Sequence, residues 1–119
     1  MSGFDERSLL CDGHESGGTL WYRTAVCDGE DAGFVVVEGG KIVKLGVLPA
    51  FRRRGVGAAL LDAALERIAL ACPAAALLCR PDNDDALRLY KRAGFQRDAV
   101  LRDHYGPGCP ALRLVRPFA

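Results

Sequence analysis

The stretch Lys41–Leu61, KIVKLGVLPAFRRRGVGAALL, contains the signals that decide the fold. Its first seven residues are mostly apolar and β-prone, which predicts a strand over Lys41–Val47. Pro49 cannot donate a ladder hydrogen bond, so the strand should end before it. The segment that follows contains three arginines and two glycines, and it leads into a helix expected from about Val56 to Ala71. The expected order is therefore strand, basic glycine loop and helix.

The loop between this strand and this helix has the composition of an anion-binding site. Its glycines let the backbone approach a ligand closely, and the start of the helix presents free N–H groups and the positive end of the helix dipole. Neighbouring arginines repel one another unless an anion lies between them. We therefore predict a cradle for a pyrophosphate group, formed by Arg52, Arg53, Arg54, Gly55, Val56, Gly57 and Ala58.

Two other phosphate-binding loops do not fit the sequence. A nucleotide P-loop would need Gly-Lys-Ser/Thr, whereas Gly57 is followed by Ala58 and Ala59. A dinucleotide fingerprint would need a third glycine where Leu60 stands. A tight strand-to-helix turn with solvated arginines remains the alternative without a ligand.

Length and composition exclude several classes of protein. The chain has 119 residues, enough for one domain, and its net charge of +1 gives no general attraction to nucleic acid or to an anionic membrane. Its five cysteines include no C-x-x-C pair, so neither a metal site nor a disulfide scaffold is expected. No segment has the length of a membrane span. We expect a cytoplasmic protein.

The remaining chain reads as short strands and one further helix. Residues 1–18 are expected to be a loosely ordered lead-in, and residues 19–119 to form a single domain. The strands Thr19–Val26 and Gly33–Glu38 should form an antiparallel meander with Lys41–Val47. Ala75–Cys79 is apolar throughout and should lie parallel to Lys41–Val47, which places the basic loop where open α/β sheets bind ligands.

The last third of the chain should hold a capped helix and two strands. Asp82 or Asn83 can cap this helix, and Gly94 should end it in the left-handed region. Tyr90 lies on its inner face. The strands are expected at residues 96–102 and 111–116, joined by a rigid loop that begins with His104 and Tyr105.

Two motifs in this order resemble the acyl-coenzyme-A signatures of the GNAT superfamily of N-acetyltransferases. The first is V-x-P-x-x-R-x-x-G-x-G-A-x-L from Val47 to Leu60, and the second is N-x-x-A-x-x-L-Y-x-x-x-G-F from Asn83 to Phe95. The resemblance implies an α/β GNAT core: a mixed, mostly antiparallel sheet with one splayed parallel strand pair and flanking helices. The segments 101–105 and 111–114 also look like the end of the RimI-like protein N-terminal acetyltransferases.

The resemblance also implies roles for particular residues. The backbone of Leu45, Gly46 and Val47 would hold the pantetheine arm and the thioester carbonyl of acetyl-CoA. The loop from Arg53 to Ala58 would bind its pyrophosphate, and Asn83 would contact the coenzyme arm. Tyr90 falls where the family has a tyrosine that protonates the departing sulfur, although a tyrosine on an inner helix face is commonly a core residue.

The sequence departs from the RimI-like pattern in two places. The glutamate that serves as general base in those enzymes is replaced here by Leu78. In the family, a strand and two helices before the sheet shape the acceptor groove, whereas only about eighteen residues precede the first predicted strand here. Any proton would then leave through water or through His104 or Tyr105. A homodimer is one arrangement that would cover an exposed groove.

These features together predict an acetyl-CoA-dependent N-acetyltransferase. Acetyl would pass to a primary amine, at a peptide N-terminus or on a small molecule, by direct attack in a ternary complex. Cys79 is the one candidate for a covalent route, but an apolar strand favours a buried, inert thiol there. The alternative is a non-catalytic acyl-CoA-binding or partner-dependent GNAT module.

Overall fold

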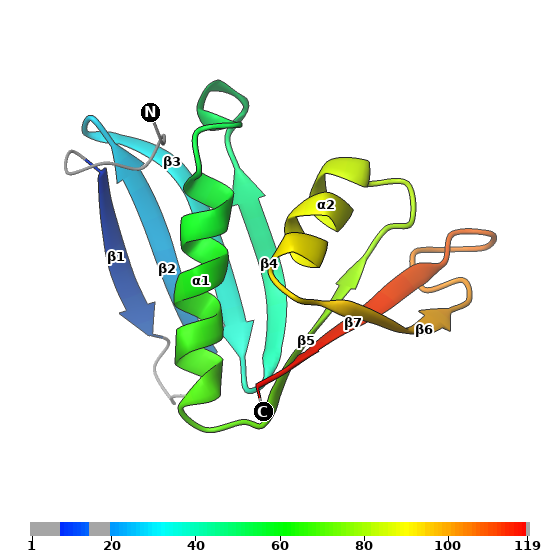
Figure 1. The fold of residues 1–119 in the computed structure, drawn as a ribbon. Helices are drawn as coiled ribbons and strands as arrows, with labels where there is room; N and C mark the ends of the chain where they lie inside the picture. Colours follow the sequence, from blue (N-terminus) through cyan, green and yellow to red (C-terminus); the bar gives the residue numbers. More distant parts are fainter. Residues whose placement is uncertain (1–7, 15–19, 119) are drawn as a thin grey trace.

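A seven-stranded mixed sheet forms the centre of the protein (Figure 1). The computed structural model describes residues 8–14 and 20–118. The strand order is β1-β2-β3-β4-β5-β7-β6, and all neighbours are antiparallel except the parallel pair β4 and β5. The strands are β1 Ser8–His14, β2 Leu20–Cys27, β3 Glu30–Glu38, β4 Lys41–Val47, β5 Ala74–Cys79, β6 Gln96–Leu101 and β7 Ala111–Pro117. This architecture confirms the predicted fold class.

Strand β1 differs from the loosely ordered lead-in expected for residues 1–18. Ser8–His14 pairs along its whole length with β2, from Ser8 opposite Cys27 to His14 opposite Trp21. The sequence of β1 has little β propensity of its own, so its conformation comes from the hydrogen bonds that β2 offers at the sheet edge.

Tight turns produce the predicted meander of β2, β3 and β4. Asp28 and Gly29 join β2 to β3 and both have positive φ angles, 52° and 82°, as the two central residues of a hairpin turn require. Gly39, at φ 59°, begins the turn into β4. Strand β3 starts at Glu30, three residues earlier than the sequence indicates.

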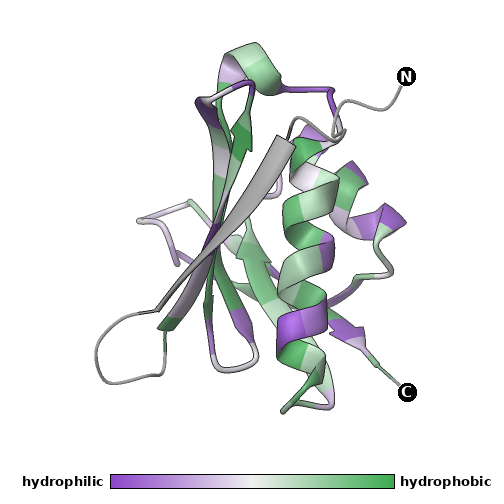
Figure 2. Cartoon of the chain, turned by 90° about the vertical axis from the view of Figure 1, so that its left-hand side faces the viewer, coloured by the Kyte–Doolittle hydropathy of each residue, from purple (hydrophilic) through white to green (hydrophobic). Residues whose placement is uncertain are grey.

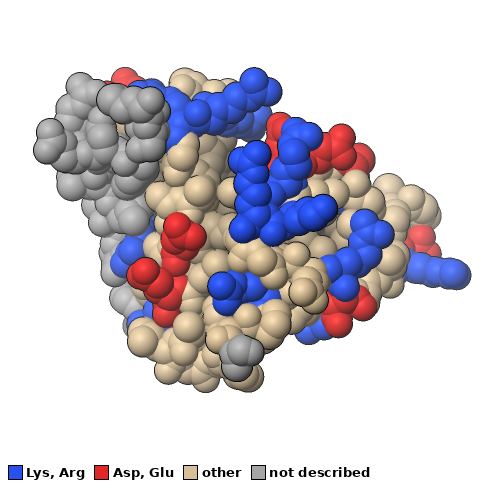
Figure 3. Space-filling model, in the orientation of Figure 1, with Lys and Arg blue, Asp and Glu red and all other residues tan. Residues whose placement is uncertain are grey.

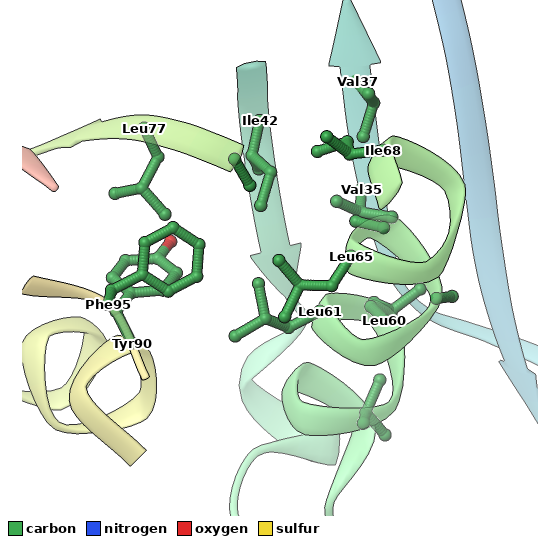
Figure 4. Close-up of a cluster of buried hydrophobic side chains, with 14 of the residues drawn as sticks. Val35, Val37, Ile42, Leu60, Leu61, Leu65, Ile68, Leu77, Tyr90 and Phe95 are labelled. Atoms are coloured by element: carbon green, nitrogen blue, oxygen red, sulfur yellow. The ribbon is translucent and has the colours of Figure 1, made fainter. Parts of the chain in front are cut away.

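Both α-helices cover the same face of the sheet (Figures 1 and 2). Helix α1, Val56–Ala69, packs its Leu60, Leu61 and Ile68 onto strand residues such as Val35, and α2, Asp84–Arg92, buries Tyr90 in the same core (Figure 4). A short 3₁₀ helix, η1 at Pro49–Phe51, precedes the basic loop.

The opposite face of the sheet carries no helix among the described residues (Figure 2). Large apolar side chains remain exposed there: Tyr22 is 38% exposed, Phe34 40% and Val43 46%. Tyr22 and Phe34 lie on this face because their neighbours in sequence, Trp21 and Val35, are buried in the core and strand side chains alternate. This surface is called the bare face below.

Strands β4 and β5 separate soon after they begin. Their register contains only Lys41 opposite Ala76 and Ile42 opposite Leu77, although both strands continue. On its other side β4 has a β-bulge: Ile42 pairs with Val37 and Lys44 with Val36, which leaves Val43 as the extra residue. Bulges bend a strand and increase its twist, and this bend starts where the two strands diverge.

Close backbone contact between β3 and β4 requires glycine at position 33. A Cβ atom added to Gly33 would lie 2.5 Å from the carbonyl oxygen of Gly46 and 3.2 Å from Leu60. We expect Gly33→Ala to lower the free energy of unfolding by about 2 kcal/mol, because the clash is with backbone that cannot rotate away. Urea titration followed by circular dichroism measures this change.

Gly57→Ala is the matched control, because its Cβ would lie 3.4 Å from Leu89, an ordinary contact. In the first turn of α1 alanine should be neutral or stabilising. Equal stability of the two variants would contradict the proposed tight approach of β3 to β4.

Candidate active site

The loop before α1 presents unpaired backbone N–H groups to solvent. Gly55 caps the helix in the left-handed conformation, at φ 79°, and no side chain accepts from the first turn. The first helical bond is donated by Ala59 to Gly55. The N–H groups of Val56, Gly57 and Ala58 therefore have no backbone acceptor within the part of the chain that the structure describes. Such a helix start, with its dipole, favours an anion.

The three arginines of the loop have different surroundings. Arg52 donates from Nε to the carbonyl oxygen of Val47 at 3.2 Å, which ties the loop to the last residue of β4. The guanidinium of Arg54 lies over the ring of Phe51, 5.6 Å from its centroid. Arg53 has a positive φ of 62° and an exposed side chain, and it forms no ion pair among the described residues. Arg53 is therefore the arginine best able to turn toward a ligand.

The separation of β4 from β5 leaves a backbone edge beside this loop. Leu45, Gly46 and Val47 have partners in β3 but none in β5. Gly46 lies under the ring of Phe34, and an added Cβ would come within 2.8 Å of it. Helix α2 closes one side of the gap, because Leu89 approaches the first turn of α1 at Gly57. A slender chain could form strand-like hydrogen bonds with this edge.

Tyr90 lies at the inner side of the gap between β4 and β5. It is 8% exposed, and its ring meets that of Phe95 edge to face with centroids 5.7 Å apart. Figure 4 shows its hydroxyl directed toward Leu77 of β5. Burial, with smaller contributions from Cys79 and Tyr105, raises the pKa of Tyr90 to about 12. The phenol therefore keeps its proton at neutral pH and can act only as a proton donor there.

Asn83 caps helix α2, which settles the choice between Asp82 and Asn83. Its Oδ1 accepts a hydrogen bond from the backbone N–H of Ala86 at 3.3 Å. Gly94, at φ 95°, follows the helix as predicted. The structure gives Asn83 this structural role, while its contact with a coenzyme arm stays a prediction.

His104 and Tyr105 lie together on the loop between β6 and β7. Both are exposed, and their rings meet edge to face at 4.8 Å. Tyr105 N–H donates to the Cys109 carbonyl, and the Gly108 N–H donates to a carboxylate oxygen of Asp103 at 2.7 Å. These bonds fix the loop, so that Tyr105 has a defined position.

Arg80 connects this loop to the end of β5. Its guanidinium lies 5.0 Å from the centroid of the Tyr105 ring and 3.7 Å from a carboxylate oxygen of Asp82. Arg80 was not predicted as a site residue from the sequence, although a cation directly after a buried strand is a recognisable signal. Asp103 was not predicted either, because its role depends on a hydrogen bond across the loop.

Cys79 does not have the environment of a nucleophile. The thiol is buried and donates to the carbonyl of Arg80 at 3.4 Å. Burial, together with the nearby charge of Asp82, raises its pKa. A raised pKa lowers the thiolate fraction at neutral pH, and the thiolate is the reactive form.

Basic side chains gather over the loop before α1 and over α2, and the acidic side chains of the first turn of α2 lie beside them (Figure 3). On α2 the basic residues are Arg88, Lys91 and Arg92, of which Arg88 forms an ion pair with Asp85. The basic side chains therefore present positive charge to an approaching anion, although the net charge of the chain is small.

Comparison with known proteins agrees with this arrangement. Residues 16–97 match the model of the acetyltransferase (GNAT) domain. The chain belongs to the GNAT acetyltransferase family. This confirms the resemblance drawn from the two sequence motifs. Members of the family use acetyl-CoA as the acetyl donor.

Relatives of this GNAT chain act on more than one kind of acceptor. The chain is 35% identical over 85 residues to an N-alpha-acetyltransferase of Sulfurisphaera tokodaii, covering 70% of this chain and 51% of that protein. It is 37% identical over 113 residues to a mycothiol acetyltransferase of Propionibacterium freudenreichii subsp. shermanii, covering 91% of this chain and 33% of that protein. The chain thus spans about half the length, or less, of these curated relatives.

A solved structure supports the same fold. The crystal structure of Ard1 from Thermoplasma volcanium superposes with a TM-score of 0.77 at 32% identity, covering 82% of this chain and 70% of that one.

Within the described residues, no helix is both long enough and apolar enough to cross a membrane.

A charge placed in the first turn of α1 separates binding from folding. Ala58 is exposed at the third helical position, where glutamate favours a helix N-terminus. We expect Ala58→Glu to keep or raise the melting temperature while weakening acetyl-CoA binding about tenfold or more, because the carboxylate repels the pyrophosphate. Ala58→Gln has the same size without the charge. Equal acetyl-CoA affinity of these two variants, measured by calorimetry, would place the pyrophosphate elsewhere.

Proposed function

We propose that this protein transfers acetyl from acetyl-CoA to a primary amine by direct attack within a ternary complex. The observation that carries the proposal is the gap between β4 and β5, which has an anion cradle at its mouth and a protonated tyrosine at its inner side. A thioester carried by an extended phosphorylated arm fits that combination. Family membership supports the donor and the reaction class.

The chain's own residues would hold the coenzyme along this gap. The N–H groups of Val56, Gly57 and Ala58 and the side chain of Arg53 would bind the pyrophosphate. The open backbone edge at Leu45, Gly46 and Val47 would bind the pantetheine arm as an added strand. The amide of Asn83 keeps its two N–H donors for the arm, because the cap uses only its oxygen.

In the reaction, the amine nitrogen forms a bond to the thioester carbonyl carbon and the carbon–sulfur bond breaks. Tyr90 would give its proton to the departing sulfur. The attacking amine loses one proton, which would leave through water or through His104 or Tyr105 on the β6–β7 loop. The raised pKa of Cys79 supports direct attack over an acyl-enzyme.

Position 78 is leucine and supplies no carboxylate base, which favours an acceptor whose ammonium group loses its proton easily. A lysine side chain with a pKa of about 10.4 needs about 4.6 kcal/mol to become neutral at pH 7. An α-amine with a pKa of about 7.7–8.0 needs only about 1–1.4 kcal/mol. An α-amine, at a peptide N-terminus or on a small molecule, is therefore the expected acceptor.

A non-catalytic acyl-CoA-binding module is the second candidate. It is favoured by Leu78, which stands at the position where the resemblance implies a general base. Calorimetry with acetyl-CoA, CoA and ATP, followed by turnover assays over a panel of amines, separates the candidates. Acetyl-CoA binding without any turnover would support the module.

The role of Tyr90 can be tested by removing its hydroxyl group. We expect Tyr90→Phe to lower the rate of the chemical step about 10²-fold, with unchanged affinity for acetyl-CoA. Because the pKa of Tyr90 is raised to about 12, this group should cause no loss of rate between pH 6 and 10 in the unmodified protein. Full single-turnover activity of Tyr90→Phe would leave Tyr90 with a packing role only.

Acceptor preference can be tested with two matched peptides. One has a free N-terminus and no lysine, and the other has a blocked N-terminus and one internal lysine. We expect faster acetylation of the α-amine at pH 7, with a difference that narrows as the pH rises toward 10. Mass spectrometry of the products measures both rates, and faster transfer to lysine at pH 7 would refute the α-amine preference.

A further inference from the structure

The arrangement of the layers leaves one approach for the acceptor, if the proposed function holds. A thioester between β4 and β5 would have α1 and α2 on one side, where Tyr90, Leu61 and Phe95 fill the core (Figure 4). The other side is the bare face (Figure 2). An amine that attacks while the coenzyme is bound must therefore arrive from the bare face.

The bare face is hollow beside β5. A pocket of about 500 Å³ lies there, and its floor is Ala74, Ala76 and Leu78. These side chains point away from the helices, because the alternating residues Ala75, Leu77 and Cys79 are buried in the core. Two alanines on the floor make the surface concave. We call this pocket the β5 trough; its far wall is formed by Leu101, Arg113 and Val115, and its near edge by Lys41.

The trough reaches the place where the reaction would occur. Leu78, at its upper end, is the first residue of β5 beyond the last β4–β5 pair, Ile42 opposite Leu77. Position 78 is also the position that lacks the expected carboxylate. The trough continues away from this point along β5 as far as Gly40 and Cys72. A volume of this size suits a small molecule or a few residues of peptide.

Two cations lie on opposite sides of the trough, and none of its described lining residues is acidic. Lys41 pairs in register with Ala76, and Arg113 pairs with Leu78. Arg113 already forms an ion pair with Asp98. Lys41 faces Glu38 in the β3–β4 register, but Lys41 forms no ion pair among the described residues. A bound anion would therefore meet Lys41 as the available partner.

We propose that the β5 trough binds an acceptor whose α-amine is followed, one residue away, by a carboxylate. Position 78 lies two residues beyond Ala76, about 6.6 Å along the strand, and β4 lies about 4.8 Å to the side. The Cα atom of Lys41 is thus about 8 Å from the upper end of the trough. An acceptor with its amine at the upper end would place a carboxylate on its next residue within reach of the flexible four-carbon side chain of Lys41.

Two sources share this chemistry, and matched acceptors distinguish them. A longer peptide supplies the carboxylate as an acidic second side chain, so Ala-Glu and Ala-Gln N-termini form one pair. A dipeptide supplies it as the C-terminal group, so Ala-Ala and its C-terminal amide form the other. Each pair differs in one charge and almost nothing else.

Calorimetric titration of the CoA-saturated protein with these four acceptors tests the proposal. We expect the charged member of at least one pair to bind about three- to tenfold more tightly at low salt. Lys41→Gln should remove most of that preference. Lys44→Gln is the control, because Lys44 is on the same strand but outside the trough. Ala76→Leu should fill the hollow and weaken both members of a pair alike, without changing CoA affinity.

Transfer rates measured in parallel separate this inference from the proposed function. Equal binding within both pairs, or a preference that survives Lys41→Gln, overturns the trough as a carboxylate site, even if acetyl transfer proceeds. A Lys41-dependent preference without turnover supports the trough and overturns the proposed function. If no acceptor binds and none is acetylated, both are overturned.

Discussion

The divergence of β4 from β5 is the constraint on which the site depends. Parallel neighbours normally satisfy each other's backbone groups along their whole length, but here the pairing stops after Ile42 and Leu77. The backbone of β4 beyond this point keeps donors and acceptors that only another chain-like molecule can use. The cost of this unpaired edge is limited because it opens to solvent beside the basic loop, where water can satisfy it.

Several local features maintain this divergence. The bulge at Val43 bends β4 away, and the ring of Phe34 covers Gly46 on the bare face. The hydrogen bond from Arg52 to the Val47 carbonyl holds the end of β4 to the loop. The same guanidinium thus organises the site without needing to touch a phosphate. The three arginines of the loop are therefore partly structural, and fewer than three of them are available to contact a ligand.

The sequence predicted the elements whose signals are local. Pro49, the glycines at the start of α1, a cap at Asp82 or Asn83 and Gly94 each act through their own backbone or the next turn, so the positions of β4, the basic loop and the two helices followed from them to within about two residues. Strand β1 could not be predicted in the same way, because its conformation comes from pairing with β2. The separate surroundings of Arg52, Arg53 and Arg54 were also hidden, since three identical residues differ only through Val47, Phe51 and solvent. Arg80 over Tyr105 and the hollow beside β5 arise between segments distant in sequence.

The two faces of the sheet divide the chemistry of the site between them. On the helical face, burial keeps Tyr90 protonated and Cys79 as a thiol, so this side can donate a proton and offers no nucleophile. On the bare face, position 78 is leucine, and the charged residues among the described lining of the trough are Lys41 and Arg113, so the trough favours anions and has no carboxylate base in that lining. Lys41, which has no ion pair within the described part of the chain, disfavours a protonated amine nearby and lowers its pKa. The positive edge of the trough would therefore help to neutralise an α-amine and hold its carboxylate, which supplies through electrostatics part of what a glutamate would supply as a base.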